Sequence, residues 1–266
     1  MSTETLRKQI ADWRAQQPST SVEGLIRWTV EGLPAGWIRP AMASRLLESG
    51  LFLQIEGGLT LNDELGGPIS RSHALQLLAE VLRGEGLLQG WRSEAYDWLD
   101  DWGRVRFSLE RSAFRPLGLC SRAVHVNGYV EDGGLWLGRR ATHKAVDPGR
   151  LDNLTAGGIA SGETVEDCLI RELAEEAGIP AWLAGFARPT GMVRSRRLEP
   201  DGLHDELLYC YDLALPADFV PTNTDGEVSS FELLDPFAVG HRLNDMTWDA
   251  AAVTVEWLGR WVEGEV

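Results

Sequence analysis

The chain has 266 residues, 44% of them hydrophobic and 24% charged, which is ordinary globular composition and enough material for two modest domains. Its formal net charge of −15 opposes nonspecific binding to nucleic acid or to an anionic membrane, because such partners are bound by basic surfaces. Since no apolar stretch approaches roughly eighteen residues and the N-terminal residues lack an apolar signal segment, we expect a soluble cytoplasmic protein without a membrane-spanning helix.

Residues 1–115 are expected to form a smaller α+β domain. Leu6, Ile10 and Trp13 recur at helical spacing and predict a helix over residues 4–16. Hydrophobic patterning predicts the following elements, interrupted by Pro34 and Pro40: strands over 25–30 and 51–55, helices over 41–48 and 70–83, and a β-like run over 92–109. Ser70 is expected to cap the helix over 70–83. No combination of residues in this part indicates catalysis.

Tryptophan is the unusual feature of this leading part: Trp13, Trp28, Trp37, Trp91, Trp98 and Trp102. Two interpretations are open. The indole rings could pack in the core, or several could form a stacking pocket for a heteroaromatic ring. On the second interpretation, the leading part selects the organic group of a substrate.

Beyond residue 122 the pattern changes to long strands. Strands are predicted over 123–130 and 135–138, joined by a hairpin turn at 131–134. Four potential cations follow at Arg139, Arg140, His143 and Lys144. In so acidic a chain they are candidates for binding a diphosphate, although a solvated basic loop has the same composition.

A glycine-rich turn and an acidic helix follow over residues 157–179. Thr164 and Asp167 predict a capped helix start, and Gly178 predicts its end. Carboxylates at spacing i, i+3 and i+4 share one helix face, where each like-charged pair costs roughly 0.2–0.5 kcal/mol unless a cation lies among them. Oxygen ligands of this kind suit Mg²⁺ or Mn²⁺. The three carboxylates are Glu172, Glu175 and Glu176.

The rest of the chain is predicted to continue the sheet and to end in a helix. A basic run at residues 194–197 is expected in a loop, with Arg194 as a candidate for substrate binding. Strands over 207–213 and 228–233 and a helix over 246–261 complete the prediction. Because the three cysteines are widely spaced, they are expected to be reduced thiols rather than disulfide partners or zinc ligands.

Residues 157–179 resemble the Nudix box at every position of its pattern. That pattern is a glycine, five residues, Glu163, seven residues, Arg171-Glu172-Leu173, one residue, Glu175-Glu176, one residue, and Gly178-Ile179. The resemblance implies an α/β/α sandwich around a mixed sheet over residues 116–266, and metal-dependent hydrolysis of a small-molecule diphosphate.

The resemblance also implies a role for each residue of the motif. Metal ligands would be Glu172, Glu175, Glu176 and the backbone at Gly157, and either Glu172 or Glu176 would act as base. Arg171 would orient a glutamate, Glu163 would hold the loop, and Glu227 would be an additional acid.

Three segments at residues 140–144, 148–153 and 225–228, together with the α+β leader, resemble a narrower branch of this family. It includes the Nudix portion found with fungal thiamine pyrophosphokinase, and it implies thiamine diphosphate or its oxidised and antivitamin forms as substrates. Alternatives are hydrolysis of ADP-ribose or NADH, an isopentenyl-diphosphate isomerase, and a non-catalytic Nudix-like module. The isomerase is disfavoured, because Ala156 and Gly158 stand where its cysteine and histidine would be. The oligomeric state is left open, with a homodimer as one alternative.

Overall fold

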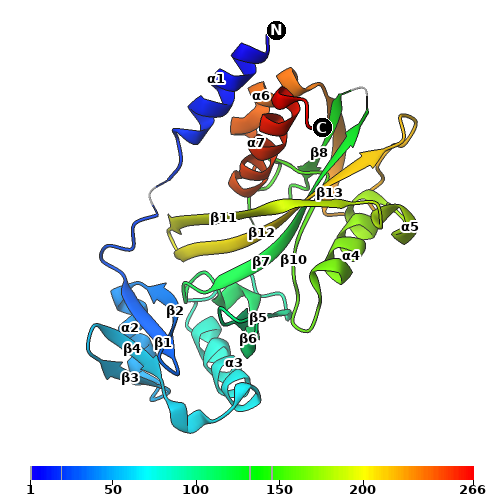
Figure 1. Ribbon diagram of the computed structural model, residues 1–266. Helices are drawn as coiled ribbons and strands as arrows, with labels where there is room; N and C mark the ends of the chain where they lie inside the picture. The colour runs from blue at the N-terminus through cyan, green and yellow to red at the C-terminus, as the bar shows by residue number, and fades with distance from the viewer. Residues whose placement is uncertain (1, 19, 132, 145) are drawn as a thin grey trace.

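The computed structural model describes residues 2–18, 20–131, 133–144 and 146–266. Its first part is a mixed sheet in the order β2-β1-β4-β3 with two helices and a separate hairpin, drawn from blue through cyan to blue-green in Figure 1. These elements are β1 (Ile26–Val30), β2 (Leu33–Ile38), α2 (Pro40–Glu48), β3 (Phe52–Ile55), β4 (Gly58–Leu61), η1 (Asp63–Leu65), α3 (Pro68–Gly84), β5 (Ala95–Leu99), β6 (Val105–Glu110) and η2 (Arg111–Ala113). Buried residues between Trp28 and Leu119 form one core here.

Most elements predicted for this part are confirmed, and three details are corrected. Strands β2 and β4 were not predicted. Pro34 lies within β2, which is an edge strand of its sheet, and edge strands are where proline is tolerated. Ser70 does not cap α3, because that helix already begins at Pro68, with Gly67 at the cap position and no side-chain cap bond.

Helix α1 (Thr3–Arg14) lies away from the rest of the leading part. It packs on α6 (Pro236–Arg242) and α7 (Trp248–Glu263), as Figure 1 shows. The predicted inward residues Leu6, Ile10 and Trp13 are all buried, and the Trp13 ring stacks on Trp248 with centroids 4.7 Å apart. The N-terminal helix therefore belongs to the hydrophobic core of α7 rather than to that of the leader sheet.

The second part is built on a seven-stranded mixed sheet among the described residues, in the order β11-β12-β7-β8-β13, with β10 paired to β7 and β9 to β8. Its strands are β7 (Cys120–Val130), β8 (Gly134–Arg140), β9 (Leu151–Asp152), β10 (Thr155–Gly158), β11 (Arg188–Glu199), β12 (Gly202–Leu215) and β13 (Val228–Leu234). Strand β12 runs parallel to β7 along its whole length, whereas β10 and β8 divide the opposite edge of β7 between them.

Helices cover both faces of this sheet (Figure 1). Because side chains alternate along a strand, Leu135 and Leu137 of β8 pack toward α1, α6 and α7, while Trp136 packs toward α4 (Val165–Ala177) and α5 (Ala181–Ala184). A short helix η3 (Leu243–Asp245) precedes α7. The predicted α/β/α sandwich with a smaller α+β region before it is therefore confirmed.

Two predictions for the second part need comment. The basic run at residues 194–197 is not a loop, because β11 pairs with β12 in continuous register from Gly191 to Glu199. The predicted hairpin turn at 131–134 includes Asp132, which lies outside the described residues. Of the cysteines, Cys168 and Cys210 are buried and Cys120 is half-buried, and all three are free thiols, as expected. No helix in the described ranges is both long and apolar enough to cross a bilayer.

Candidate active site

The acidic helix of the box is α4, and the predicted caps are confirmed. The Thr164 hydroxyl accepts the Asp167 N–H at 3.0 Å, and the Asp167 carboxylate accepts the Thr164 N–H at 3.4 Å. The helix ends at Gly178, which has a left-handed φ of 66°. Leu173 is fully buried against the sheet. Burial of such a side chain contributes roughly 1.5–3 kcal/mol to the stability of the fold, and it determines which way the helix face with the glutamates points.

Arg171 links the carboxylates of the box. Its guanidinium donates to both oxygens of Glu163 at 2.8 and 3.0 Å, to Glu172 at 2.6 Å and to Glu175 at 3.2 Å. Partial burial opposes ionisation of Glu163, but the Arg171 hydrogen bonds outweigh it and lower the pKa of that carboxyl. One guanidinium therefore offsets repulsion among three like charges and fixes the orientation of Glu172.

Two consecutive glycines let other groups approach the strand before the box loop. A Cβ at Gly157 would lie 1.7 Å from Glu172 Oε1, so the Glu172 carboxylate occupies the space that any other residue would need. A Cβ at Gly158 would lie 1.7 Å from the Tyr96 hydroxyl. Just before them, the Ala156 N–H donates to Glu176 Oε2 at 2.9 Å. The backbone of β10 thus contacts both buried glutamates of α4.

Burial raises the pKa of two box carboxyls. Glu172 is 7% exposed and Glu176 is 6% exposed. Loss of hydration is the main cause for both, and the negative charge of Glu175 adds to it at Glu172. For Glu176, burial followed by the charge of Glu172 raises the pKa to about 8. A cation that displaces these protons would remove the cost of the buried charges, so this pair fits a divalent metal.

A cavity of about 620 Å³ opens beside these residues, within the size range of small-molecule sites. Glu172 and Glu175 line it from α4, and Gly157 lines it from β10. The leading part supplies much of the remaining wall, including Arg92, Glu94, Tyr96, Arg111 and Phe114. The leader therefore meets the second part over the box, as a role in substrate selection would require.

The leader also holds the box loop directly. The Asp97 carboxylate of β5 accepts hydrogen bonds from the Ser161 hydroxyl at 2.6 Å and the Gly162 N–H at 2.9 Å. The Ser161 N–H in turn donates to the Ala95 carbonyl at 2.8 Å. Ser161 and Gly162 lie within the box pattern, immediately before Glu163. The position of the box loop therefore depends on a strand from outside the sandwich.

Some of the cations expected to bind a diphosphate line the cavity, and others do not. Lys144 and Arg140 line the cavity. Lys144 forms an ion pair with Glu227, which also lines the cavity, and burial lowers the pKa of Lys144. Arg140 donates to Asp152 at 2.8 Å and to the Val146 carbonyl at 3.0 Å. Both cations and Glu227 therefore line the same cavity as Glu172 and Glu175.

Arg139 and Arg194, which were also predicted to bind the substrate, do not line this cavity. Arg139 precedes Arg140 on β8, so its side chain points to the opposite face, where it contacts Glu232 at 2.6 Å. Arg194 lies on β11 and is held by both oxygens of Asp205 at 2.8 and 2.9 Å. Strand pairing, which the charge pattern alone does not reveal, separates these arginines from Lys144.

Of the two interpretations of the leader tryptophans, the structure supports packing for the buried ones. None of the six leader tryptophans lines the cavity. Trp28 and Trp98 are buried and stack on Phe107 with centroids 6.2 and 5.3 Å away, while Trp102 is exposed. Trp28 and Trp98 are part of the leader's own core, and the aromatic edges that reach the cavity belong to Tyr96 and Phe114.

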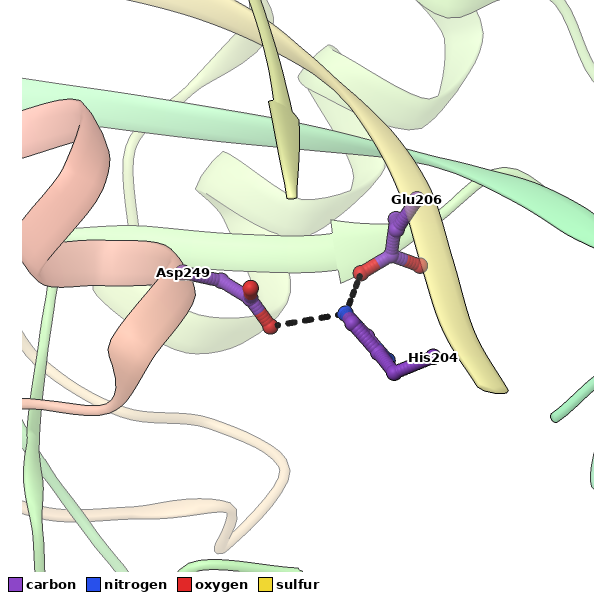
Figure 2. Close-up of side chains that lie close together, drawn as sticks. All are labelled: His204, Glu206 and Asp249. Atoms are coloured by element: carbon purple, nitrogen blue, oxygen red, sulfur yellow. Dashed lines mark ion pairs between the residues drawn. The ribbon is translucent and has the colours of Figure 1, made fainter. Parts of the chain in front are cut away.

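Sequence reasoning missed another cluster on the same cavity, which Figure 2 shows: His204 and Glu206 of β12 and Asp249 of α7. His204 Nε2 lies 3.3 Å from Asp249 Oδ2 and 3.9 Å from Glu206 Oε2. Burial opposes ionisation of Asp249, but its contacts with His204 and Arg197 keep the pKa of this carboxyl well below its usual value. The signal in the sequence is the i, i+2 spacing of His204 and Glu206, which places both side chains on one face of a strand.

Comparison with known proteins assigns the part of the chain that contains the box to a known family. The model of the NUDIX domain matches residues 121–258, slightly more than half of the chain, and covers the sheet, α4 and α7. The chain belongs to the Nudix family. A second model, a domain of unknown function named DUF4743, matches residues 6–121. The division at residues 115/116 stays a prediction.

Named relatives are found in plants. The chain is 42% identical over 187 residues to Nudix hydrolase 24, chloroplastic, of Arabidopsis thaliana, an alignment that covers 69% of this chain and 51% of that protein. It is 40% identical to Nudix hydrolase 20, chloroplastic, of the same plant, covering 68% and 50%. The chain thus spans about half the length of these curated relatives. Among solved structures, DR0079 from Deinococcus radiodurans aligns with a TM-score of 0.50 and 25% identity, covering 63% of this chain and 98% of that one.

Proposed function

We propose that this Nudix chain is a divalent-metal-dependent diphosphohydrolase that cleaves a small-molecule diphosphate to a monophosphate. The supporting observation is the position of Glu172 and Glu175 on the wall of a cavity that Lys144 and Arg140 also line. Carboxylates suit Mg²⁺ or Mn²⁺, and the two cations suit diphosphate oxygens. Candidate metal ligands and candidate diphosphate-binding cations therefore line the same cavity.

Each residue of the site has a role in this proposal. A bound divalent cation would neutralise the diphosphate and polarise the attacking water. Glu172, Glu175, Glu176 and the Gly157 carbonyl would hold that cation, and Arg171 would keep Glu172 in position. Glu172 faces the cavity and would accept the proton of the water. Glu176, with its pKa raised to about 8, is the second candidate base.

Within this class we propose thiamine diphosphate, or its oxidised and antivitamin forms, as the substrate. Support comes from the segments at residues 140–144 and 148–153, and from the leader that forms a wall of the cavity. Tyr96 and Phe114, whose rings meet edge to face at 5.5 Å, give this wall aromatic edges. Contact with a flat heteroaromatic group there would gain roughly 0.5–1.5 kcal/mol per aromatic pair. ADP-ribose and NADH, which also join an aromatic base to a diphosphate, are the alternative.

Two other functions are less well supported. The isomerase would need a histidine at position 158, where even a Cβ would collide with the Tyr96 hydroxyl at 1.7 Å. A non-catalytic module would have no need for the box glutamates, and this chain retains all three. For location, the cytoplasm stays a prediction, since the two Arabidopsis relatives carry chloroplastic names.

The proposal is tested by incubating the full chain with Mg²⁺ and a panel of diphosphates, followed by identification of the products by mass. The panel holds thiamine, oxothiamine and oxythiamine diphosphates, ADP-ribose, NADH and nucleotides. We expect a thiamine-type diphosphate to yield a monophosphate and inorganic phosphate with the highest kcat/KM. Preference for ADP-ribose or NADH would move the substrate to the alternative class, and no turnover of any diphosphate would reject the hydrolase.

Asp97 should matter to turnover although it belongs to the leader. Asp97→Ala removes the acceptor of the Ser161 and Gly162 hydrogen bonds, so the box loop loses its outside support. Because loss of such supporting contacts typically costs roughly 10–100-fold in metal affinity or activity, we expect a decrease in kcat/KM of that order. The matched control is Asp101→Ala in the turn of the same hairpin, where the side chain is exposed. Equal kcat/KM in the two variants would show that the loop holds its position without Asp97.

A further inference from the structure

The cluster of His204, Glu206 and Asp249 has the arrangement of an additional ligand set. One atom of each residue lies within 4.8 Å of the others. At metal–ligand distances of about 2.0–2.2 Å, neighbouring ligands around one ion lie roughly 3–4 Å apart, close to the 3.3 and 3.9 Å from His204 Nε2 to Asp249 and Glu206. Figure 2 shows the imidazole pointing between the two carboxylates.

A second observation singles out the imidazole. His204 is 8% exposed, and its Nε2 makes no hydrogen bond with acceptable geometry among the described residues. A buried ring nitrogen without a hydrogen bond is unfavourable, because it has lost its contact with water. The fold holds this atom 3.3 Å from one carboxylate and 3.9 Å from the other, without hydrogen-bond geometry to either. That arrangement is the one expected of a metal ligand.

Each carboxylate is also held from outside the cluster. Ser121 donates to Glu206 Oε1 at 2.8 Å, and Arg197 donates to Asp249 Oδ1 at 2.7 Å. The oxygens nearest His204 Nε2 are the other ones, Glu206 Oε2 and Asp249 Oδ2. Arg197 also donates to Asp249 Oδ2, at the longer distance of 3.4 Å. Outer partners of this kind are what orient ligands in metal sites.

We propose that His204, Glu206 and Asp249 bind a divalent transition metal of the Zn²⁺ or Mn²⁺ type, at a site separate from the box. An imidazole nitrogen beside two carboxylates favours such ions over Mg²⁺, which prefers oxygen ligands alone. Arg197 contacts Glu199 at 2.8 Å as well as Asp249. The three carboxylates and one guanidinium of this group leave two negative charges, which one divalent cation balances.

The strand register separates the two sites. Glu206 pairs with Ser121 on β7, whereas Gly157 of the box pairs with Val124 on the same strand. Three residues along a strand correspond to roughly 10 Å. Because residues of both sites line one cavity, an ion at His204 would leave its remaining coordination positions open to whatever the cavity holds.

The test counts Zn²⁺ ions bound by the full chain in equilibrium dialysis with excess Mg²⁺. The parent is Glu172→Gln/Glu176→Gln, in which the box is disabled, and we expect it to retain one Zn²⁺ per chain. Since loss of an outer partner already costs roughly 10–100-fold, His204→Ala in this background should weaken Zn²⁺ binding by at least about 100-fold. His73→Ala, which removes an exposed histidine on α3, should leave binding unchanged.

Glu206→Gln tests the same site independently, in case His204→Ala does not fold. It keeps the shape and the Ser121 contact but removes the charge, and circular dichroism would verify its fold. Loss of Zn²⁺ in this folded variant supports the site. If the box-disabled parent binds no Zn²⁺, or if His204→Ala and Glu206→Gln both fold and bind it like the parent, the cluster is not a metal site. None of these outcomes depends on hydrolysis, so they are separate from the test of the proposed function.

Discussion

Glu176→Gln is expected to lower kcat/KM by roughly 10²–10⁴-fold, the range for loss of a catalytic base or of a charge that stabilises the transition state. The substitution keeps the shape and an acceptor for the Ala156 N–H, which now donates to Glu176 Oε2 at 2.9 Å. It removes the charge that a cation would balance. The measurement is steady-state hydrolysis of the best diphosphate in saturating Mg²⁺.

Although Glu176→Gln should lower activity, it should not lower the thermal stability of the metal-free protein. Burial raises the pKa of Glu176 to about 8 in the folded, metal-free protein. Ionisation of Glu176 therefore lowers the free energy of unfolding, by an amount that grows as the pH rises from the ordinary glutamate range to about 8 and is constant above it. Gln carries no such cost, and the metal-free variant should unfold at an equal or higher temperature. Added Mg²⁺ should raise the unfolding temperature of the wild type more than that of the variant.

Glu166→Gln is the matched control, because Glu166 lies on the same helix with an exposed side chain. It changes the net charge equally and should leave turnover within about twofold of the wild type. If Glu176→Gln behaved like Glu166→Gln, the assignment of the box as the metal site would fail.

Gly157→Ala is expected to disrupt the site by shape alone. The added Cβ would lie 1.7 Å from Glu172 Oε1 and 1.9 Å from its carboxyl carbon, so the carboxylate must move. Because a displacement of about 1 Å can cost roughly 10²-fold in rate, we expect kcat/KM to fall by at least that factor. Overpacking of this kind typically costs about 1–3 kcal/mol in the free energy of unfolding, which urea denaturation would measure.

The control for this variant is Gly259→Ala on α7, where nothing lies within 4 Å of the added Cβ. Alanine in a helix interior is favoured over glycine by roughly 0.5–1 kcal/mol, so this variant should be slightly more stable and equally active. Full activity of Gly157→Ala would mean that Glu172 does not need its present position.

The sequence alone determined the box and the architecture around it. Thr164, Asp167 and Gly178 fix the ends of α4 through local hydrogen bonds and a left-handed turn, interactions that reach only a few residues along the chain. The spacing of Glu172, Glu175 and Glu176 on one helix face is likewise a local property. Pairing between strands that are distant in sequence could not be predicted from local spacing. For that reason the prediction did not include β2 and β4, and it placed residues 194–197 in a loop.

Tertiary structure decided which charged and aromatic groups meet the box. Arg139 and Arg140 are neighbours in sequence, but the alternation of β8 sends only Arg140 to the cavity. Trp28 and Trp98 lie in the leader core, while Asp97 and Tyr96 reach the box across more than sixty residues of sequence. His204, Glu206 and Asp249 come together only because α7 packs beside β12. Contacts of this kind depend on strand register and on packing between distant elements, and neither is encoded in the local spacing of residues.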